Sequence, residues 1–334
     1  MLRSFIALSI ISLTFSACRD DFSLEAPPMD IPLIYAYIDA DSSQNFLRVE
    51  RIFVSGGGDA NRVAQDADAL FYGPEAATVT VSTPNGNSAT LTRVNGEDFG
   101  LSRDAGTFVN SPNILYRLDG SDLNLTTAES ATISVTTDQG TMAEASTALL
   151  PEIEIRNPQT DQGINPRDYN RMTTFRWDAN GPEARVFDLR LFYNIREITN
   201  DGTNEVIDVR LEQVINRSFI RPDDGDIITF QISNESIWQF IGANLDEDAP
   251  VDRIFDGFEF EITAVGSEIE ELIDLSNANS GITSAQAPPL YTNVEGGLGV
   301  VTSRTKAVLR DIPLNAQSRE ELRDGTYTSN LNFQ

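Results

Sequence analysis

Short runs of β-forming residues, separated by turn residues, restrict this 334-residue chain to a mainly β fold. Val, Ile, Thr, Tyr and Phe dominate the runs, and Gly, Pro, Asn or Asp residues stand between them. In the first half of the chain the runs cover residues 31–38, 46–54, 77–82, 88–94, 114–118 and 131–137. In the second half they cover residues 172–177, 186–195, 205–212, 227–232 and 258–265. Strands at this spacing predict two antiparallel β-sandwiches.

Local patterns predict a hairpin and a half-buried strand. Residues 78–81 and 89–92 alternate around Asn85-Gly86, a dipeptide favoured at hairpin turns. From Phe187 to Tyr193 every second residue is apolar, so one face of that strand should be buried. Trp177 ends the preceding run, and we expect it in the core of a fibronectin-like sandwich.

Turn residues also divide the chain into segments. Prolines and glycines gather in residues 151–166, which we expect to be a linker. An immunoglobulin-like sandwich is expected before it, over residues 31–150, and a second β-rich domain after it, over residues 167–314. Residues 315–334 are expected to form a polar C-terminal tail. A chain with one cysteine forms no internal disulfide, so these domains depend on buried apolar surface.

Short helices are expected among the strands. Residues 59–70 place their apolar side chains on one helical face. Residues 234–245 carry an apolar stripe that includes Trp238. A further helix begins at Ser267, where Ser267 and Glu270 have capping-box spacing and an apolar stripe follows. We expect the last two stripes to face the core; contact with a partner or a membrane is the alternative.

The only cysteine, Cys18, follows a short apolar stretch that ends in the small residues Ser16 and Ala17. With a basic residue near its start, the segment 1–17 has the architecture of a signal peptide. The apolar stretch is too short to span a bilayer comfortably. We therefore expect a bacterial lipoprotein, cleaved before Cys18 and acylated there, with the acidic and proline-containing residues 18–30 as its lipidated tether.

The charge balance is strongly acidic. Asp and Glu number 51 against 24 Lys and Arg, which gives a formal net charge of −27. Nucleic acid is therefore not an expected partner, because a phosphate backbone requires clustered basic residues. Anionic membrane surfaces are disfavoured for the same reason, which leaves the lipid as the expected link to the membrane.

The chain contains no histidine. Histidine is the usual general base at neutral pH and the commonest metal ligand, so Ser-His-Asp triads, Cys-His dyads and ordinary zinc sites are excluded. Chemistry based on carboxylates remains open, either as a glycosidase pair or as a calcium site.

Acidic loops offer weak calcium candidates. Asp223, Asp224 and Asp226 surround a glycine that permits a tight loop, and we choose them as the best of these candidates. No acidic loop completes the spacing of an EF-hand, and solvated turns are the simpler interpretation of a chain this acidic. No other cofactor is expected.

A segment near the C-terminus supports a resemblance. Residues 288–301 read PPLYTNVEGGLGVV, in which Tyr291, Asn293, Val294, Gly297 and Gly299 match the pattern P-x-Y-x-N-[IV]-x-x-G-x-G-[IVL]. With Cys18 and the order of β-rich domains, the chain resembles Bacteroidota surface lipoproteins that carry a domain of unknown function. The resemblance implies an accessory role beside TonB-dependent outer-membrane transporters, and it implies no catalytic residue. By residue pattern alone, the glycines mark bulges or close backbone approach.

These observations predict a non-catalytic binding or assembly protein that is lipid-anchored in the outer membrane and exposed at the cell surface. Its expected partners are a TonB-dependent transporter and a glycan or peptide ligand. A carboxylate-based hydrolase and a structural or adhesive surface protein are the alternatives. Exposed aromatic side chains would favour a glycan ligand, and Phe71, Tyr72 and Trp238 are the aromatic residues considered for that role.

Overall fold

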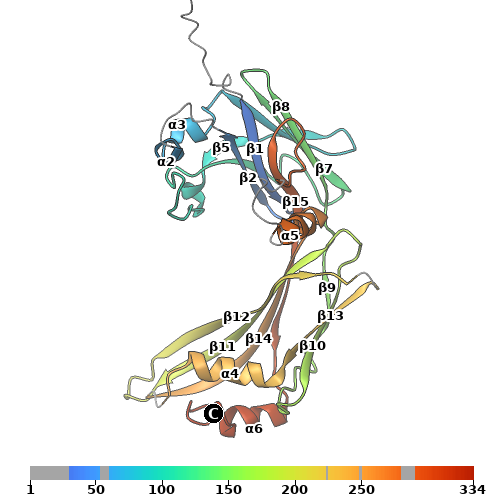
Figure 1. The fold of residues 1–334 in the computed structure, drawn as a ribbon. Coiled ribbons are helices and arrows are strands. Elements are labelled where there is room, and N and C mark those ends of the chain that lie inside the picture. Colours follow the sequence, from blue (N-terminus) through green and yellow to red (C-terminus); the bar gives the residue numbers. More distant parts are fainter. Residues whose placement is uncertain (1–29, 53–59, 223–224, 248–249, 280–289) are drawn as a thin grey trace, which may run out of the picture.

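The computed structural model describes residues 30–52, 60–222, 225–247, 250–279 and 290–334. The fold is mainly β, as predicted, and the sheets within these residues are predominantly antiparallel (Figure 1). The largest sheet has the spatial order β12 (Val206–Ile220), β11 (Val186–Thr199), β14 (Val251–Val265), β15 (Leu298–Ile312), β1 (Ile31–Ile38), β2 (Gln44–Ile52), β6 (Ile114–Asp119) and β5 (Thr92–Asn95). The other sheets are β4 (Ser88–Thr90), β3 (Ala77–Ser82), β7 (Ser130–Thr137) and β8 (Met142–Ala148), and β13 (Ile227–Ser233), β10 (Met172–Asp178) and β9 (Glu154–Asn157).

The long strand β15 joins the two halves of the large sheet. Its first residues pair in parallel with β1, from Leu33 opposite Leu298 to Ile38 opposite Ser303. Its later residues pair antiparallel with β14. The parallel pair departs from the purely antiparallel prediction. It is possible because more than two hundred residues separate the two strands and can form the long crossover connection that parallel pairing requires.

A first hydrophobic core lies between the four-stranded sheet and the β1–β2–β6 part of the large sheet. Strand alternation builds it: Ile34, Ala36 and Ile38 are fully buried, whereas the intervening Tyr35 and Tyr37 point outward. The predicted hairpin is present in this region, since β3 pairs antiparallel with β4 across a turn that contains Gly86.

A second core fills the space between the three-stranded sheet and the β11–β14–β15 part of the large sheet. Trp177 is completely buried, as predicted, and its ring lies edge-on to Phe187 at 5.3 Å between centroids. The alternation predicted around Phe187 is confirmed, because Phe187, Leu189 and Leu191 are fully buried.

The helices predicted over residues 59–70 and 234–245 and from Ser267 are present. The 59–70 segment forms α2 (Ala60–Ala64) and α3 (Ala67–Leu70), with a short 3₁₀ turn η1 (Gly96–Phe99) in a later loop. The stripe of α4 (Asn234–Asn244) is buried, and Trp238 Nε1 donates to the Pro166 carbonyl at 2.9 Å. None of the helices in the described parts of the chain has the length and apolar character needed to cross a membrane.

The exception to core-facing packing is α5 (Ser267–Asn279). Its apolar residues Ile269, Leu272, Ile273 and Leu275 are all half-buried rather than buried. Glu270, expected in the capping box, instead forms a two-pronged ion pair with Arg185, at 2.6 and 2.9 Å. The helix is thus held by the ion pair with Arg185, the residue just before β11, and by contacts with β15.

Two segments outside the predicted domains are structured. The predicted linker, residues 151–166, contributes β9 to the three-stranded sheet. Residues 315–334, expected to be a polar tail, instead form α6 (Ala316–Asp324) and a closing turn that packs on the second core. Leu322, Leu331 and Phe333 are buried there, because these few apolar side chains face the core while the polar majority faces solvent.

The glycines of the closing segment permit close backbone approach, as predicted. Gly299 has a φ of +120°, and a Cβ at this position would lie 1.9 Å from the Ile34 carbonyl oxygen on β1. Asn293 fixes the same strand, since its amide donates to the Val301 carbonyl at 2.7 Å and accepts from the Val301 N–H at 3.0 Å. These residues of the motif therefore stabilise the parallel pairing of β15 with β1.

Candidate functional site

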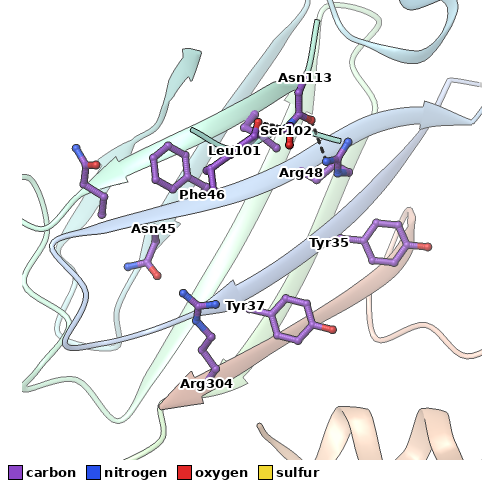
Figure 2. A pocket seen from close by; sticks show the side chains of 11 residues that line it. Tyr35, Tyr37, Asn45, Phe46, Arg48, Leu101, Ser102, Asn113 and Arg304 are labelled. Carbon is purple, nitrogen blue, oxygen red and sulfur yellow. Dashed lines mark hydrogen bonds between the residues drawn. The ribbon is translucent and has the colours of Figure 1, made fainter. Parts of the chain in front are cut away.

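An open groove of about 370 Å³ lies on the outer face of the first half of the large sheet (Figure 2). Strands β1, β2, β6 and β15 form its floor, and the loop after η1 forms one wall. Its lining residues are Tyr35, Tyr37, Gln44, Asn45, Phe46, Arg48, Leu101, Ser102, Asn113, Leu115 and Arg304.

The two tyrosines of β1 are the most exposed aromatic side chains of the groove. Tyr35 is 44% and Tyr37 47% exposed, although β1 is an interior strand of the sheet. They project outward because their neighbours Ile34 and Ala36 occupy the inward positions of the same strand. Positions two apart on a strand lie about 7 Å from each other, so the rings form a short row on one face (Figure 2).

Further apolar groups extend this row. Phe46 on β2 packs against Phe99 with 5.3 Å between ring centroids. The Arg117 guanidinium lies over the Phe99 ring, 5.0 Å from its centroid. Leu101 is 38% exposed and forms part of the wall. The groove thus exposes apolar side chains to water in a concave surface, which is typical of a ligand site.

A triad of charged residues at the β2 side leaves one positive charge uncompensated. Glu50 is buried and accepts hydrogen bonds from Arg48 at 3.0 Å and from Arg103 at 2.7 Å. Arg48 also donates to the Asn113 side-chain oxygen at 2.9 Å, which fixes its guanidinium at the groove. One carboxylate neutralises only one of two arginines, so the triad favours an anionic group nearby.

A second cation stands at the β15 side. Arg304 is next to Tyr37 in the groove, and its nearest carboxylate is Asp39, with Nε 3.7 Å from Oδ2. This separation is too long for a strong charge-assisted hydrogen bond. The partial burial of the Tyr37 side chain raises the pKa of its hydroxyl above the ordinary value, against an opposing effect of Arg304, so this hydroxyl is neutral at physiological pH.

No acidic residue lines the groove among the residues that the structure describes. This is notable in a chain with 51 acidic residues and a net charge of −27. The local excess of arginine over carboxylate makes the groove an electrostatic exception on an acidic molecule.

The residues singled out from the sequence do not gather at this groove. Cys18, Asp223 and Asp224 lie outside the described residues. Asp226 is exposed in the loop before β13. Arg221 donates to the Gly225 carbonyl of this loop at 3.3 Å, so a guanidinium competes with any cation for that oxygen. Within the described ranges no three His, Cys, Asp or Glu side chains come together as a metal site.

The aromatic residues considered for glycan contact are all buried. Phe71 is 4%, Tyr72 1% and Trp238 1% exposed. Tyr72 instead donates to Asp30 at 2.8 Å. The exposed pair, Tyr35 and Tyr37, was missed by sequence reasoning, although the alternation in residues 31–38 already places both tyrosines opposite the aliphatic residues.

No protein-family model matches the chain, and no curated protein matches it.

Proposed function

We propose that this chain is a non-catalytic binding protein, anchored to the outer membrane through Cys18, that holds a ligand at the cell surface in the groove of Tyr35 and Tyr37. The observation that carries the proposal is the exposed row of Tyr35 and Tyr37, flanked by Arg48 and Arg304. Exposed apolar side chains with a polar rim mark binding sites, because covering them with a ligand removes apolar surface from water. Its anchoring follows from the signal-peptide architecture of residues 1–17.

The composition of the groove favours binding over hydrolysis. A glycosidase of the carboxylate type needs two carboxyl groups that flank the bond to be cleaved. The described residues that line the groove include neither Asp nor Glu. A carboxylate-based hydrolase, the alternative, would therefore need a site elsewhere on the molecule.

The architecture favours a groove that is held in a fixed position relative to the rest of the molecule. We infer two sandwich-like halves, the first immunoglobulin-like and the second fibronectin-like, that are joined by β15. Ser303 connects three segments where this strand passes between the halves: its hydroxyl donates to the Ile38 carbonyl at 2.9 Å and accepts from the Leu150 N–H at 3.0 Å. A partner bound to one half would thus be fixed relative to a ligand on the other.

The binding proposal is tested by screening the protein on arrays of glycans and peptides. We expect at least one class of probe to bind the unmodified chain. This binding should be lost in the double variant Tyr35→Ala and Tyr37→Ala. Ile227→Ala is the matched control, because Ile227 is 55% exposed on β13, away from the groove. Binding that survives in the double variant, or no binding to any probe, would reject the groove as the site.

The accessory role is tested separately by mild detergent extraction of the tagged, lipidated protein from its native outer membrane. The resemblance to transporter-associated lipoproteins predicts recovery of a TonB-dependent transporter in a stoichiometric amount. Recovery of the lipoprotein alone would reject a stable complex and would favour a free-standing adhesive or binding protein.

A further inference from the structure

The strands of the groove floor are interior strands of the large sheet, although the pairing of β1 with β2 ends at Tyr35 opposite Arg48. Strand β1 lies between β15 and β2, and β2 lies between β1 and β6. Peptides that are recognised in extended form usually add a strand to a free sheet edge, where main-chain groups are available. At the groove, residues 35–38 pair with β15 and Gln44–Leu47 pair with β6, so each strand keeps one paired side and neither is an outer edge of the sheet. The side chains above these strands are the groups that the groove offers to a ligand.

The side chains on offer suit sugar rings. Tyr35 and Tyr37 project from positions about 7 Å apart along the strand, and Phe46 lines the same groove from β2. The C–H face of a pyranose packs on an aromatic ring in the way that other apolar groups do, while its hydroxyls stay in water. A row of rings on a flat sheet therefore fits successive residues of an extended oligosaccharide.

The charges narrow the class of sugar. Arg48 and Arg103 share the single carboxylate of Glu50, so this triad has a net positive charge, and Arg304 has one carboxylate contact, to Asp39 at 3.7 Å. Guanidinium groups pair with carboxylates through two parallel hydrogen bonds, and no acidic lining residue opposes such a ligand. The acidic remainder of the surface acts weakly at the groove, because salt screens exposed charges beyond about 8 Å.

We propose that the groove binds an acidic oligosaccharide of uronic acid residues, with sugar faces on Tyr35 and Tyr37 and carboxylates on Arg48 and Arg304. This assignment rests on the proposed binding function and specifies its ligand class.

The test is isothermal titration of the detergent-solubilised full chain with oligogalacturonate, oligomannuronate and oligoglucuronate. The fully methyl-esterified form of each oligosaccharide serves as its neutral match with an identical backbone. We expect at least one uronate to bind and its methyl ester to bind about tenfold or more weakly, since a hydrogen bond to a charged group is worth about one order of magnitude in affinity. Affinity should also fall as salt is raised.

Variants assign the contacts. Arg304→Gln should weaken uronate binding about tenfold and leave methyl-ester binding unchanged. Arg310→Gln is the matched control, because Arg310 is an exposed arginine of the same strand with one carboxylate at 3.5 Å, outside the groove. Tyr35→Phe and Tyr37→Phe should retain binding, whereas the alanine changes should abolish it, if ring faces carry the contact.

The outcomes separate the two proposals. Equal affinity for the uronate and its methyl ester, or loss of affinity in Arg310→Gln as large as in Arg304→Gln, overturns the acidic assignment. Absence of binding to all three uronates, together with tyrosine-dependent binding of another probe on the arrays, also overturns it and leaves the binding function standing. Binding that no groove variant changes overturns both.

Discussion

At the residue scale, single positions decide how the strands approach one another. Gly299 brings β15 against β1 at a φ of +120°, and Asn293 closes the adjoining segment by bonding to both polar backbone groups of Val301. Tyr193 is fully buried in the second core, and its hydroxyl donates a hydrogen bond to the side-chain oxygen of Gln213. Each of these residues has a role that one substitution can test.

Gly299→Ala should destabilise the protein by about 3–5 kcal/mol, because the added Cβ meets the Ile34 carbonyl and the backbone conformation is strained. Gly86→Ala is the control, since Gly86 also has a positive φ of +85° but has open space around its Cβ position. It should cost only about 1–2 kcal/mol. Urea unfolding measures both values, and equal losses would contradict the close approach of β15 and β1.

The buried Tyr193 should make stability fall at high pH. Burial raises its pKa in the folded state, so the unfolded chain releases this proton first. The stabilising effect is complete below the ordinary tyrosine pKa of about 10 and is lost as pH rises above it, by at most about 1.4 kcal/mol per pH unit. Urea midpoints measured across this range should fall less steeply for Tyr193→Phe than for the unmodified chain. Identical slopes would show that Tyr193 ionises equally in both states.

At the element scale, local pattern predicts position better than it predicts pairing. The hairpin at Asn85-Gly86, the alternation of β11 and the helix α4 were predictable because turn chemistry and periodicity encode them locally. Strand β8 was missed, because its sequence MAEASTA has weak β-propensity and is a strand only through its pairing with β7. The run 88–94 divides between β4 and β5 in different sheets, which no local pattern indicates.

The C-terminal helix α6 illustrates the same limit. Most of its residues are polar, so the segment was predicted to be a tail, whereas the tertiary structure buries Leu322 at 3% exposure. Leu322→Ala should therefore cost about 2–5 kcal/mol through the cavity that it leaves. Leu290→Ala, at a position 72% exposed, should change stability by less than about 0.5 kcal/mol. Thermal unfolding compares the two; a neutral Leu322→Ala would mean that the segment does not pack as described.

At the scale of the whole molecule, the net charge and the proposed lipid anchor both bear on membrane association. A net charge of −27 keeps the chain soluble and disfavours anionic surfaces, and the groove is a local exception to that charge. The groove itself could not be predicted from the sequence, because it joins residues of β1, β2 and the distant β15. Only the outward position of its tyrosines was accessible from alternation.

The proposed lipid anchor is tested by Cys18→Ser. This variant should move from the membrane fraction to the soluble fraction when expressed in its native host, because the proposed acyl chains would supply the membrane affinity. The groove variant Tyr35→Ala with Tyr37→Ala should stay in the membrane fraction. Membrane retention of Cys18→Ser would show that another part of the chain holds it there.

The location of the bound ligand tests the central claim most directly. In the Cys18→Ser background the chain has no thiol, so a single cysteine can report on one place. Ser102→Cys places it in the groove, and Ser88→Cys places it on the exposed β4 strand of the opposite sheet. With a ligand found on the arrays, alkylation should slow severalfold at position 102 and stay unchanged at position 88. Equal rates at position 102 with and without ligand, or equal protection at both positions, would contradict the groove as the binding site.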